Sequence, residues 1–334
     1  MEGPARLKAT LEACSTRTVI VIGDLINDEY LFGKPARISR EAPVLILRFA
    51  EREVFLGGAG NATNNVHALG ARVVPVGVIG HDRAGEELLA LFRAAGIPTD
   101  GIVAEVGRDT PVKTRIMAGG YQATRQQVVR LDREPAGDLQ PITEDDLLTK
   151  LTAFAERADA IIVSDYGYGT VSARVFERVK AVARRANTIV TVDSRYDLPR
   201  YTGITAATPN EAELEQLTGT SVDNERAVEK AGRQLLERLD ARILLVTRGS
   251  RGMALLERDG GTTFIPIYGT DEIADVSGAG DTVISAFTVA LACGASPTDA
   301  ASLANIAGGL VVMKRGTASV SRAELQEALG DVVP

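Results

Sequence analysis

The chain has 334 residues, of which 45% are hydrophobic and 24% are charged, and this composition excludes a disordered chain. Its net charge of -7 argues against a binder of nucleic acid or of membrane surfaces, since both need a basic face. Cys14 and Cys293 are too few for a disulfide framework, and the two histidines exclude a His-rich metal site. No apolar run approaches the roughly 20 residues that span a bilayer, and no signal peptide precedes residue 15, so a cytoplasmic protein is expected.

Short apolar runs alternate with longer amphipathic runs along the chain. The expected strands are 18–23, 71–80, 160–164, 188–192 and 242–247. The expected helices are 62–69, 144–157, 172–185 and 224–239, with two or three more after residue 280. This alternation predicts an α/β fold with a mostly parallel sheet covered on both faces. Because no repeat or linker interrupts it, a single domain over residues 1–334 is expected.

Two segments break the alternation. Residues 29–56 contain strand-like runs at 44–49 and 53–56. Residues 110–132 contain runs at 112–117 and 127–131, with a turn expected at Gly119-Gly120. Together they predict a small accessory sheet built from two excursions. The alternative is a pair of ordinary surface hairpins.

The most informative motif is Asp275-Val-Ser-Gly-Ala-Gly-Asp-Thr282, which precedes an apolar helical run. The small residues Gly278, Ala279 and Gly280 let backbone N–H groups approach an anion, and the following helix adds unpaired N–H groups. Asp281 places a carboxylate beside this anion hole. That combination is explained if Asp281 is a general base, which takes the proton of a hydroxyl group that attacks a phosphoryl group. The alternative is a helix cap after a tight turn.

A second glycine motif, Gly57-Gly-Ala-Gly-Asn61, opens the helix expected at 62–69. It lacks the third glycine of the dinucleotide fingerprint, and no P-loop motif occurs in the chain. Gly57 and Gly58 with Asn61 and Asn65 suit hydrogen bonding to a polyol. A plain helix-start turn is an equally good interpretation of this motif alone.

A third motif, 207–214, places Asn210 and Glu213 three residues apart at the start of a helix. Side chains at this spacing share a helix face and could hold magnesium through water. A capping box is the favoured interpretation when the motif is taken alone.

A fourth motif, Val246-Thr-Arg-Gly-Ser-Arg-Gly-Met253, leaves a strand through a glycine loop. Its N–H groups, with Arg248, could contact nucleotide phosphates. A hairpin turn explains the same residues, and both interpretations can hold together.

Taken in order, these motifs resemble the PfkB family of carbohydrate kinases, whose fold is a ribokinase-like three-layer sandwich with a small β-sheet lid. The resemblance covers about residues 18–329. Residues 57–61 resemble the first family signature, and 275–282 resemble the second, with Ser277 where threonine is commoner.

The resemblance implies ATP and Mg2+ as cofactors, with K+ as a further candidate, and a role for each matching residue. Asp281 is the implied base, and Gly278, Ala279 and Gly280 are the implied anion hole. Implied acceptor-binding residues are Asp24, Gly57, Gly58, Asn61, Arg37 and Lys113. Implied ATP-binding residues are Asn210, Thr247, Arg248, Gly249, Gly252 and Asn305. Asn210 and Glu213 would order magnesium through water, and Asp275 a monovalent cation. The lid, about 29–56 and 110–132, would close over the sugar and mediate a homodimer.

Within the family, the chain is most similar to the D-glycero-D-manno-heptose 7-phosphate kinases. Arg37-Ile-Ser-Arg-Glu-Ala-Pro-Val44 resembles their R-I-S-P-E-A-P-V, and Ser164-Asp-Tyr166 resembles part of their S-D-Y-A-K-G. Tyr168 replaces the lysine of that motif, and Asp193-Ser-Arg-Tyr196 replaces their D-P-K-G. The chain has no H-x-G-H motif, so it is not expected to carry out nucleotidyl transfer.

The lid segments are basic in a chain that is acidic overall. Their cationic residues are Arg37, Arg40, Arg48, Lys113, Arg115, Arg125 and Arg130. A basic lid predicts an acceptor that already carries a phosphate, because arginine binds phosphate through paired donors. The expected reaction is phosphorylation of heptose 7-phosphate at the anomeric hydroxyl. Fructose 6-phosphate, ribose or a nucleoside are alternative acceptors, and a silent sugar or nucleotide sensor and a nicotinamide-dependent dehydrogenase are alternative functions.

Overall fold

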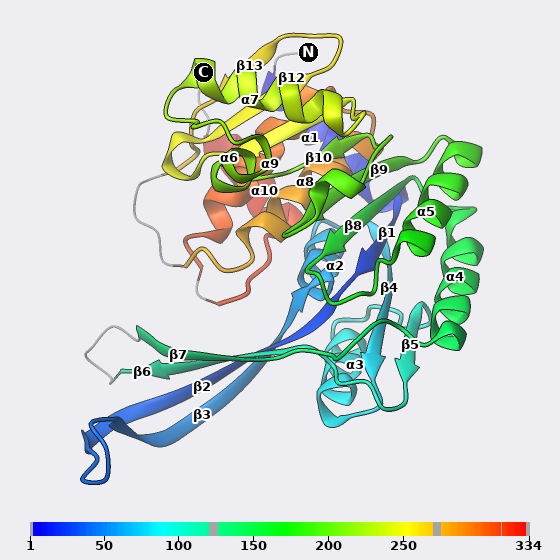
Figure 1. The fold of residues 1–334 in the computed structure, drawn as a ribbon. Helices are drawn as coiled ribbons and strands as arrows, with labels where there is room; N and C mark the ends of the chain where they lie inside the picture. Colours follow the sequence, from blue (N-terminus) through cyan, green and yellow to red (C-terminus); the bar gives the residue numbers. More distant parts are fainter. Residues whose placement is uncertain (1–2, 120–125, 270–274, 315, 332–334) are drawn as a thin grey trace.

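The structure is a computed structural model, and it describes residues 3–119, 126–269, 275–314 and 316–331. Its main sheet has nine strands in the spatial order β13-β12-β11-β10-β9-β8-β1-β4-β5 (Figure 1). The strands are β1 Thr18–Gly23, β4 Arg72–Gly80, β5 Ile102–Glu105, β8 Ala160–Asp165, β9 Ile189–Ser194, β10 Ala206–Ala207, β11 Ile243–Thr247, β12 Met253–Glu257 and β13 Thr262–Ile265. Pairing is parallel from β11 through to β5, whereas β12 and β13 are antiparallel. The predicted mostly parallel sheet is therefore confirmed.

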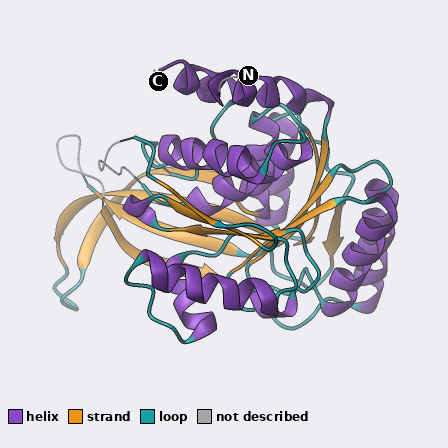
Figure 2. Ribbon diagram, turned by 90° about the horizontal axis from the view of Figure 1, so that it is seen from above, coloured by secondary structure: helices purple, strands orange, loops and turns teal. Residues whose placement is uncertain are grey.

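Helices cover both faces of this sheet (Figure 2). They are α1 Gly3–Ala13, α2 Ala59–Ala68, α3 Arg83–Ala94, α4 Pro141–Ala155, α5 Ala173–Ala186, α6 Glu211–Thr218, α7 Glu225–Arg238, α8 Ala279–Ala292, α9 Pro297–Val311 and α10 Arg322–Asp331. Strand side chains alternate between the faces: Val19 and Val21 of β1 join the core with α2, α8 and α9. Ile20 and Ile22 join the other core, with α4, α5 and α7. This alternation explains why β1 is apolar at each position from Val19 to Ile22.

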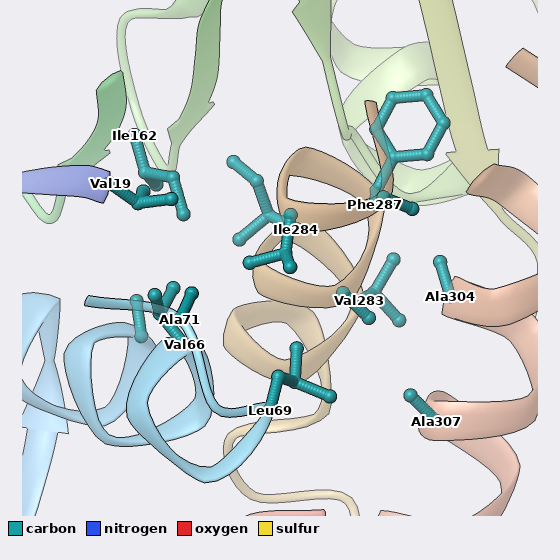
Figure 3. Packing of buried hydrophobic residues seen from close by; sticks show 14 of the residues in the cluster. Val19, Val66, Leu69, Ala71, Ile162, Val283, Ile284, Phe287, Ala304 and Ala307 are labelled. Carbon is teal, nitrogen blue, oxygen red and sulfur yellow. The ribbon is translucent and has the colours of Figure 1, made fainter. Parts of the chain in front are cut away.

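Helix α8 is enclosed along nearly its whole length. Val283, Ile284 and Phe287 fill the space between the strand residue Ile162 and the small residues of α9 (Figure 3). Small side chains such as Ala304 let the two helices approach closely, as the sequence predicts for this region. A helix that is apolar on all sides belongs in a core, and its first turn is therefore held rigidly.

A second sheet of four strands, ordered β3-β2-β6-β7, extends away from the body (Figure 1). Its strands are β2 Leu25–Ile38, β3 Leu45–Gly58, β6 Val112–Ala118 and β7 Gln126–Arg133. Parallel pairing of β2 with β6 joins the two excursions into one sheet, so the alternative of separate surface hairpins is wrong. We call this sheet the lid. The turn expected at Gly119-Gly120 lies partly outside the described residues.

The first lid excursion differs from its prediction. The runs 44–49 and 53–56 are parts of one strand, β3, whose register with β2 shifts where Phe32 faces Glu51 and Gly33 faces Phe49. Strand β2 itself was not expected, because Gly33, Pro35 and charged residues interrupt its apolar pattern. Pairing with β3 along its length, and with β6 over residues 27–33, holds β2 extended all the same.

Most other boundaries agree with the prediction within a few residues. The sequence did not predict α1, α3, β5 or β13. It expected two or three helices after residue 280, and α8, α9 and α10 are found in that region. No helix within the described ranges is long and apolar enough to cross a membrane.

Candidate active site

The carboxylate of Asp281 lies in the first turn of α8 and is 3% exposed. Asn61 of α2 donates a hydrogen bond from Nδ2 to Asp281 Oδ2 at 2.8 Å. The hydroxyl group of Tyr166, just after β8, donates to Oδ1 at 3.1 Å. Three motifs that are far apart in the sequence therefore meet at one carboxylate.

Asn61 is itself oriented by a neighbour one helical turn along α2. Asn65 donates from Nδ2 to Asn61 Oδ1 at 3.1 Å, and the Thr282 hydroxyl donates to Asn65 Oδ1 at 2.9 Å. Because Asn61 Oδ1 already accepts a hydrogen bond, its amide nitrogen turns toward Asp281. Asn61 and Asn65 are at most 1% exposed, and here they hold the carboxylate. Their expected role in binding a polyol stays a prediction.

The pKa of Asp281 is raised to about 6, chiefly because burial penalises the charged form. Hydrogen bonds from Asn61 and Tyr166 lower the pKa, the nearby Asp28 raises it, and Lys113 lowers it. The carboxylate is thus ionised at neutral pH and is a stronger base than an exposed aspartate. These are the properties of a general base that works near pH 7.

The turn before Asp281 exposes backbone N–H groups at the start of α8. Gly278 has φ 77°, and a Cβ there would lie 2.4 Å from Asn61 Nδ2, so a side chain is excluded. The N–H of Ala279 donates to Val276 O at 3.3 Å. The first N–H groups of a helix, here those at Gly280 and Asp281, lack acceptors inside it. The turn is suited to the predicted anion hole.

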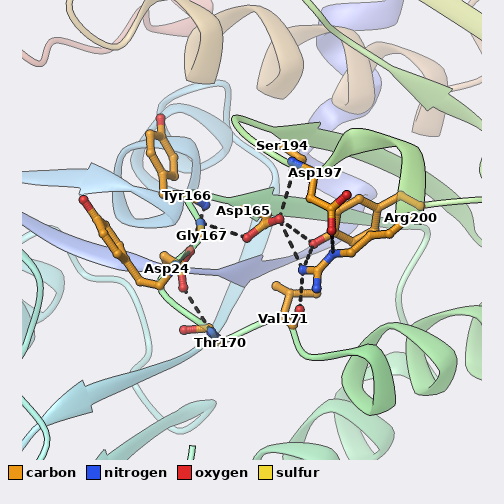
Figure 4. Close-up of polar contacts among 11 residues, drawn as sticks. Asp24, Asp165, Tyr166, Gly167, Thr170, Val171, Ser194, Asp197 and Arg200 are labelled. Carbon is orange, nitrogen blue, oxygen red and sulfur yellow. Dashed lines mark hydrogen bonds and ion pairs between the residues drawn. The ribbon is translucent and has the colours of Figure 1, made fainter. Parts of the chain in front are cut away.

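Asp24, for which the resemblance implies acceptor binding, holds the loop after β8 in this structure. Its carboxylate accepts hydrogen bonds from the backbone N–H groups of Tyr166, Tyr168 and Thr170 at 2.8, 3.1 and 3.2 Å. It is 1% exposed, and its role in acceptor binding stays a prediction. Asp24 fixes the loop that carries Tyr166 (Figure 4).

Asp165 fixes the other side of the same loop. It accepts hydrogen bonds from the Gly167 N–H at 3.0 Å, from Ser194 Oγ at 2.9 Å and from the Tyr201 hydroxyl at 2.7 Å. Arg200 also contacts it, at 3.2 Å (Figure 4). With Asp24 and Asp165 both satisfied, the loop after β8 presents the Tyr166 hydroxyl in a fixed position.

Asp28 is a site residue that the sequence analysis missed. Its Oδ1 accepts from Arg115 at 2.8 Å and its Oδ2 accepts from Thr317 Oγ1 at 3.1 Å, and its charge raises the pKa of Asp281. A Cβ on Gly57 would lie 2.7 Å from this carboxylate, which explains the glycine there. The signal that could have found Asp28 is its place five residues after the end of the first predicted strand, on the unexpected strand β2.

Gly58 has φ 56°, and a Cβ there would lie 2.6 Å from the Asp24 carbonyl oxygen. The position therefore needs glycine for the turn between β3 and α2. Its role in acceptor binding stays a prediction.

Lys113 lies at the base of the lid, where β6 pairs it with Asp28 of β2. Its ammonium lies 4.3 Å from the centre of the Tyr166 ring, and burial lowers its pKa. No carboxylate lies within ion-pair distance of Lys113 among the described residues. Lys113 is thus a cation beside the base and in position for a ligand.

Arg37, by contrast, lies nine residues beyond Asp28 on β2, about 30 Å along the strand. It is exposed near the far end of the lid, so the structure does not bring it to Asp281 within one chain.

The loops expected to bind nucleotide meet at the ends of β10 and β11. Asn210 and Glu213 form a capping box: each backbone N–H donates to the other side chain at 2.9 Å. Thr247 forms a parallel bridge with Asn210. Arg248 is buried, paired with Glu211 at 2.9 Å, and its guanidinium is therefore engaged by the protein. The capping-box and hairpin-turn interpretations are confirmed, whereas contacts with ATP stay predictions.

Three further residues that were predicted to bind ATP, Gly249, Gly252 and Asn305, lie in or near these loops. Gly252 has φ 79°, and a Cβ there would lie 2.0 Å from Ile265 O, whereas Gly249 is open. Asn305 donates from Nδ2 to Pro266 O at 2.7 Å.

Asp275 connects the turn before α8 to the segment after α9. Its carboxylate accepts from the N–H groups of Ser277 at 2.9 Å and Gly316 at 3.1 Å. Its role with a monovalent cation stays a prediction.

Carboxylates gather where magnesium is expected. Burial and the charges of Asp281 and Glu213 raise the pKa of Asp193 well above its ordinary value. No cluster of three acidic, histidine or cysteine side chains in the described part of the chain could hold a metal directly. Magnesium usually keeps several waters and binds substrate phosphates. The residues therefore fit a magnesium ion that is held mainly through water.

The fold and the site together define a sugar kinase. A model described as pfkB family carbohydrate kinase matches residues 16–324, so the chain belongs to this family and is an ATP-dependent carbohydrate kinase. The dehydrogenase alternative is therefore wrong. The chain is 42% identical over 312 residues to "Bifunctional protein HldE" of Geobacter sulfurreducens, covering 93% of this chain and 62% of that protein. The protein of the same name from Gluconacetobacter diazotrophicus is 40% identical, covering 93% and 63%. The chain thus spans less than two thirds of these relatives.

Solved structures share the fold. Ribokinase of Arabidopsis thaliana, complexed with ribose and ATP, has a TM-score of 0.75 at 20% identity, covering 94% of this chain and 98% of that one. Phosphofructokinase-2 from Escherichia coli, in complex with potassium, has a TM-score of 0.78 at 19% identity, with the same coverage. The ribokinase-like fold is confirmed.

Proposed function

We propose that the chain transfers the γ-phosphoryl group of ATP to the anomeric hydroxyl group of heptose 7-phosphate, in the cytosol where ATP is supplied. The observation that carries the proposal is Asp281: a buried carboxylate with a pKa of about 6, held by Asn61 and Tyr166 beside helix N–H groups. A retained, oriented base argues against a silent sensor, which has no need of one.

The acceptor hydroxyl group gives its proton to Asp281 as its oxygen forms a bond to the γ-phosphorus and ADP leaves. The N–H groups of Gly280 and Asp281 at the start of α8 stabilise charge on the transferred group. Asn61 and Tyr166 keep the carboxylate ionised and oriented until it takes the proton. Magnesium, when bound through water near Asn210 and Glu213, supplies positive charge to the phosphates of ATP.

A phosphate already on the acceptor is supported by the cations at the base of the lid. Lys113, Arg115 and Arg130 are close enough that each arginine lowers the pKa of the lysine. Arg115 is paired with Asp28, and Arg130 is paired with Asp132 on its own strand. Lys113 has no such partner among the described residues, and a phosphate would supply one.

The test is kcat/KM, from ADP release, for matched pairs of free and phosphorylated sugars. Heptose 7-phosphate should exceed free heptose by on the order of 100-fold, because the remote phosphate helps position the reacting hydroxyl group. A free sugar that equals every phosphorylated sugar contradicts the phosphorylated acceptor. If fructose 6-phosphate is the better substrate, a phosphorylated acceptor is retained and heptose is wrong.

Two lid variants locate the phosphate. Lys113→Met should lower kcat/KM for the sugar phosphate at least tenfold and leave the free sugar nearly unchanged. Arg37→Met, at the far end of the lid, is the matched control. It should leave kcat/KM unchanged for both the sugar phosphate and the free sugar, because Arg37 lies far from Asp281 of its own subunit. Equal losses in the two variants would place the phosphate elsewhere.

We further propose a homodimer formed through the lid. Exposed apolar side chains lie on its strands, among them Phe49 at 72% and Leu131 at 66% exposure. Phe49→Glu should convert a dimer into a monomer in sedimentation velocity. Val106→Glu, at an equally exposed site outside the lid strands, should not. A monomeric wild type would refute the proposal.

Asp275 is the residue that we propose for a monovalent cation such as K+. Its position beside the turn before α8 links any such ion to the anion hole. Activation by K+ that is lost in Asp275→Asn, with Na+ as the comparison salt, would support this role.

A further inference from the structure

The two cysteines of the chain, far apart in sequence, lie side by side. Cys14 follows α1 in the 3-10 turn Cys14–Thr16, and Cys293 is the residue that ends α8. Their sulfur atoms are 3.8 Å apart across a sequence separation of 279 residues. Cysteine count and spacing gave no indication of this pairing.

The two thiols differ in environment. Cys14 is fully buried, whereas Cys293 is partly exposed. The hydrogen bond between the thiols and the nearby Arg17 guanidinium lower the pKa of Cys293. The hydrogen bond and burial raise the pKa of Cys14. An accessible cysteine with a lowered pKa beside a buried thiol is the arrangement of an attacking and a resolving cysteine.

The surroundings also leave room for the sulfur atoms to approach. A disulfide needs a sulfur separation of about 2.05 Å, so the pair must close by less than 2 Å. A cavity of about 10 Å³, lined by Cys14 together with Thr10, Leu11 and Leu69, lies beside the buried thiol. The cavity gives the Cys14 side chain space in which to turn as the two sulfur atoms approach.

We propose that Cys293 and Cys14 form an oxidative modification site, at which a hydroperoxide converts the two thiols into an intramolecular disulfide. The Cys293 thiolate attacks the peroxide: an S–O bond forms, the O–O bond breaks, and an alcohol or water leaves. Cys14 then attacks the sulfenic sulfur, the S–S bond forms, and the hydroxyl group leaves as water with the Cys14 proton. Two thiols are oxidised and one peroxide is reduced.

The bond would join the N-terminal segment to the end of α8 without reaching the catalytic end. Asp281 is twelve residues from Cys293, about 18 Å along the helix. Turnover should therefore change by less than twofold. Because the disulfide would close a loop of 279 residues, the midpoint temperature of thermal unfolding should rise by about 3–8 °C.

The experiment treats the native protein with hydrogen peroxide and measures its intact mass and its thiols in denaturant. A loss of about 2 Da, with both thiols gone and a Cys14–Cys293 peptide pair, is expected. Dithiothreitol should reverse it. A gain of oxygen at Cys293 without the link, or an unreacted pair, would overturn the proposal. A covalent dimer would overturn it as well.

Two variants separate the roles. Cys14→Ser should leave a Cys293 sulfenic acid that dimedone traps, because the resolving thiol is gone. Cys293→Ser should leave Cys14 unreactive, because Cys14 is buried. Trapping at Cys14 in place of Cys293 would contradict the assigned order. The wild-type mass measurement stands by itself if either variant fails to fold.

Discussion

Replacing Tyr166 by phenylalanine should move the pH dependence of catalysis. The Tyr166 hydroxyl donates a hydrogen bond to Asp281, which stabilises the charged carboxylate and lowers its pKa. Without this bond the pKa should rise above its value of about 6. The base is active when deprotonated, so the acid limb of kcat/KM should shift to higher pH, while the alkaline plateau changes little. The aromatic ring beneath Lys113 is kept.

The size of the shift follows from the geometry. The distance of 3.1 Å between the Tyr166 hydroxyl oxygen and Asp281 Oδ1 is long for a hydrogen bond to a carboxylate. We therefore take this hydrogen bond to stabilise the charged carboxylate by about 1 kcal/mol. At about 1.4 kcal/mol per pKa unit, the acid limb should move up by about 0.7 pH units. At pH 6 the variant should therefore be about twofold to fourfold slower than the wild type, relative to the plateau.

The assay is a pH profile of kcat/KM between pH 5 and 9, from ADP release at constant ionic strength. An acceptor phosphate also titrates near pH 6, but it does so identically for both proteins, so the difference between profiles reports on the enzyme. Tyr168→Phe is the matched control, since the Tyr168 hydroxyl lies 3.5 Å from Glu134 and has no bond to Asp281. An unshifted profile in Tyr166→Phe, or an equal shift in the control, would refute the reasoning.

Three further predictions concern residues around the same carboxylate. Asp281→Asn should lower kcat by a hundredfold to ten-thousandfold; it should also raise stability at pH 8 by about 2–3 kcal/mol, because the buried charge is removed. The extra unfolding free energy of the variant should shrink as pH falls through 6 and vanish below 4, because the Asp281 pKa is raised to about 6 in the folded wild type. Denaturant titrations at several pH values would check this dependence. Glu213→Gln should keep the capping box but raise the magnesium concentration for half-maximal rate, so an unchanged titration would contradict the metal role. Asn65→Ala should lower kcat more than it changes KM, because Asn61 loses its orienting bond; a pure KM effect would be inconsistent with this positioning role.

Local patterns in the sequence were enough for several parts of this protein. The apolar run 18–23 between helical segments predicted a buried strand, and the helix after Gly280 was evident from its length and composition. The capping box of Asn210 and Glu213 was also readable, since it depends on residues three positions apart. Such features depend on residues that are close in the sequence, so a short segment of the chain is enough to predict them. Asp281, the proposed base, could be predicted because its motif is contiguous.

The roles of partners that come from distant segments were decided only by the tertiary structure. Asn61 was expected to bind sugar, yet it contacts Asp281 across a separation of 220 residues. Asp24 was assigned to the acceptor, but the loop after β8 surrounds it, and Asp28 on an unexpected strand lies by the base. Cys14 and Cys293 are likewise neighbours in space although 279 residues separate them in the sequence, so their pairing could not be predicted. The direction in which a buried polar side chain points depends on donors and acceptors that packing brings near it, and those are absent from the local sequence.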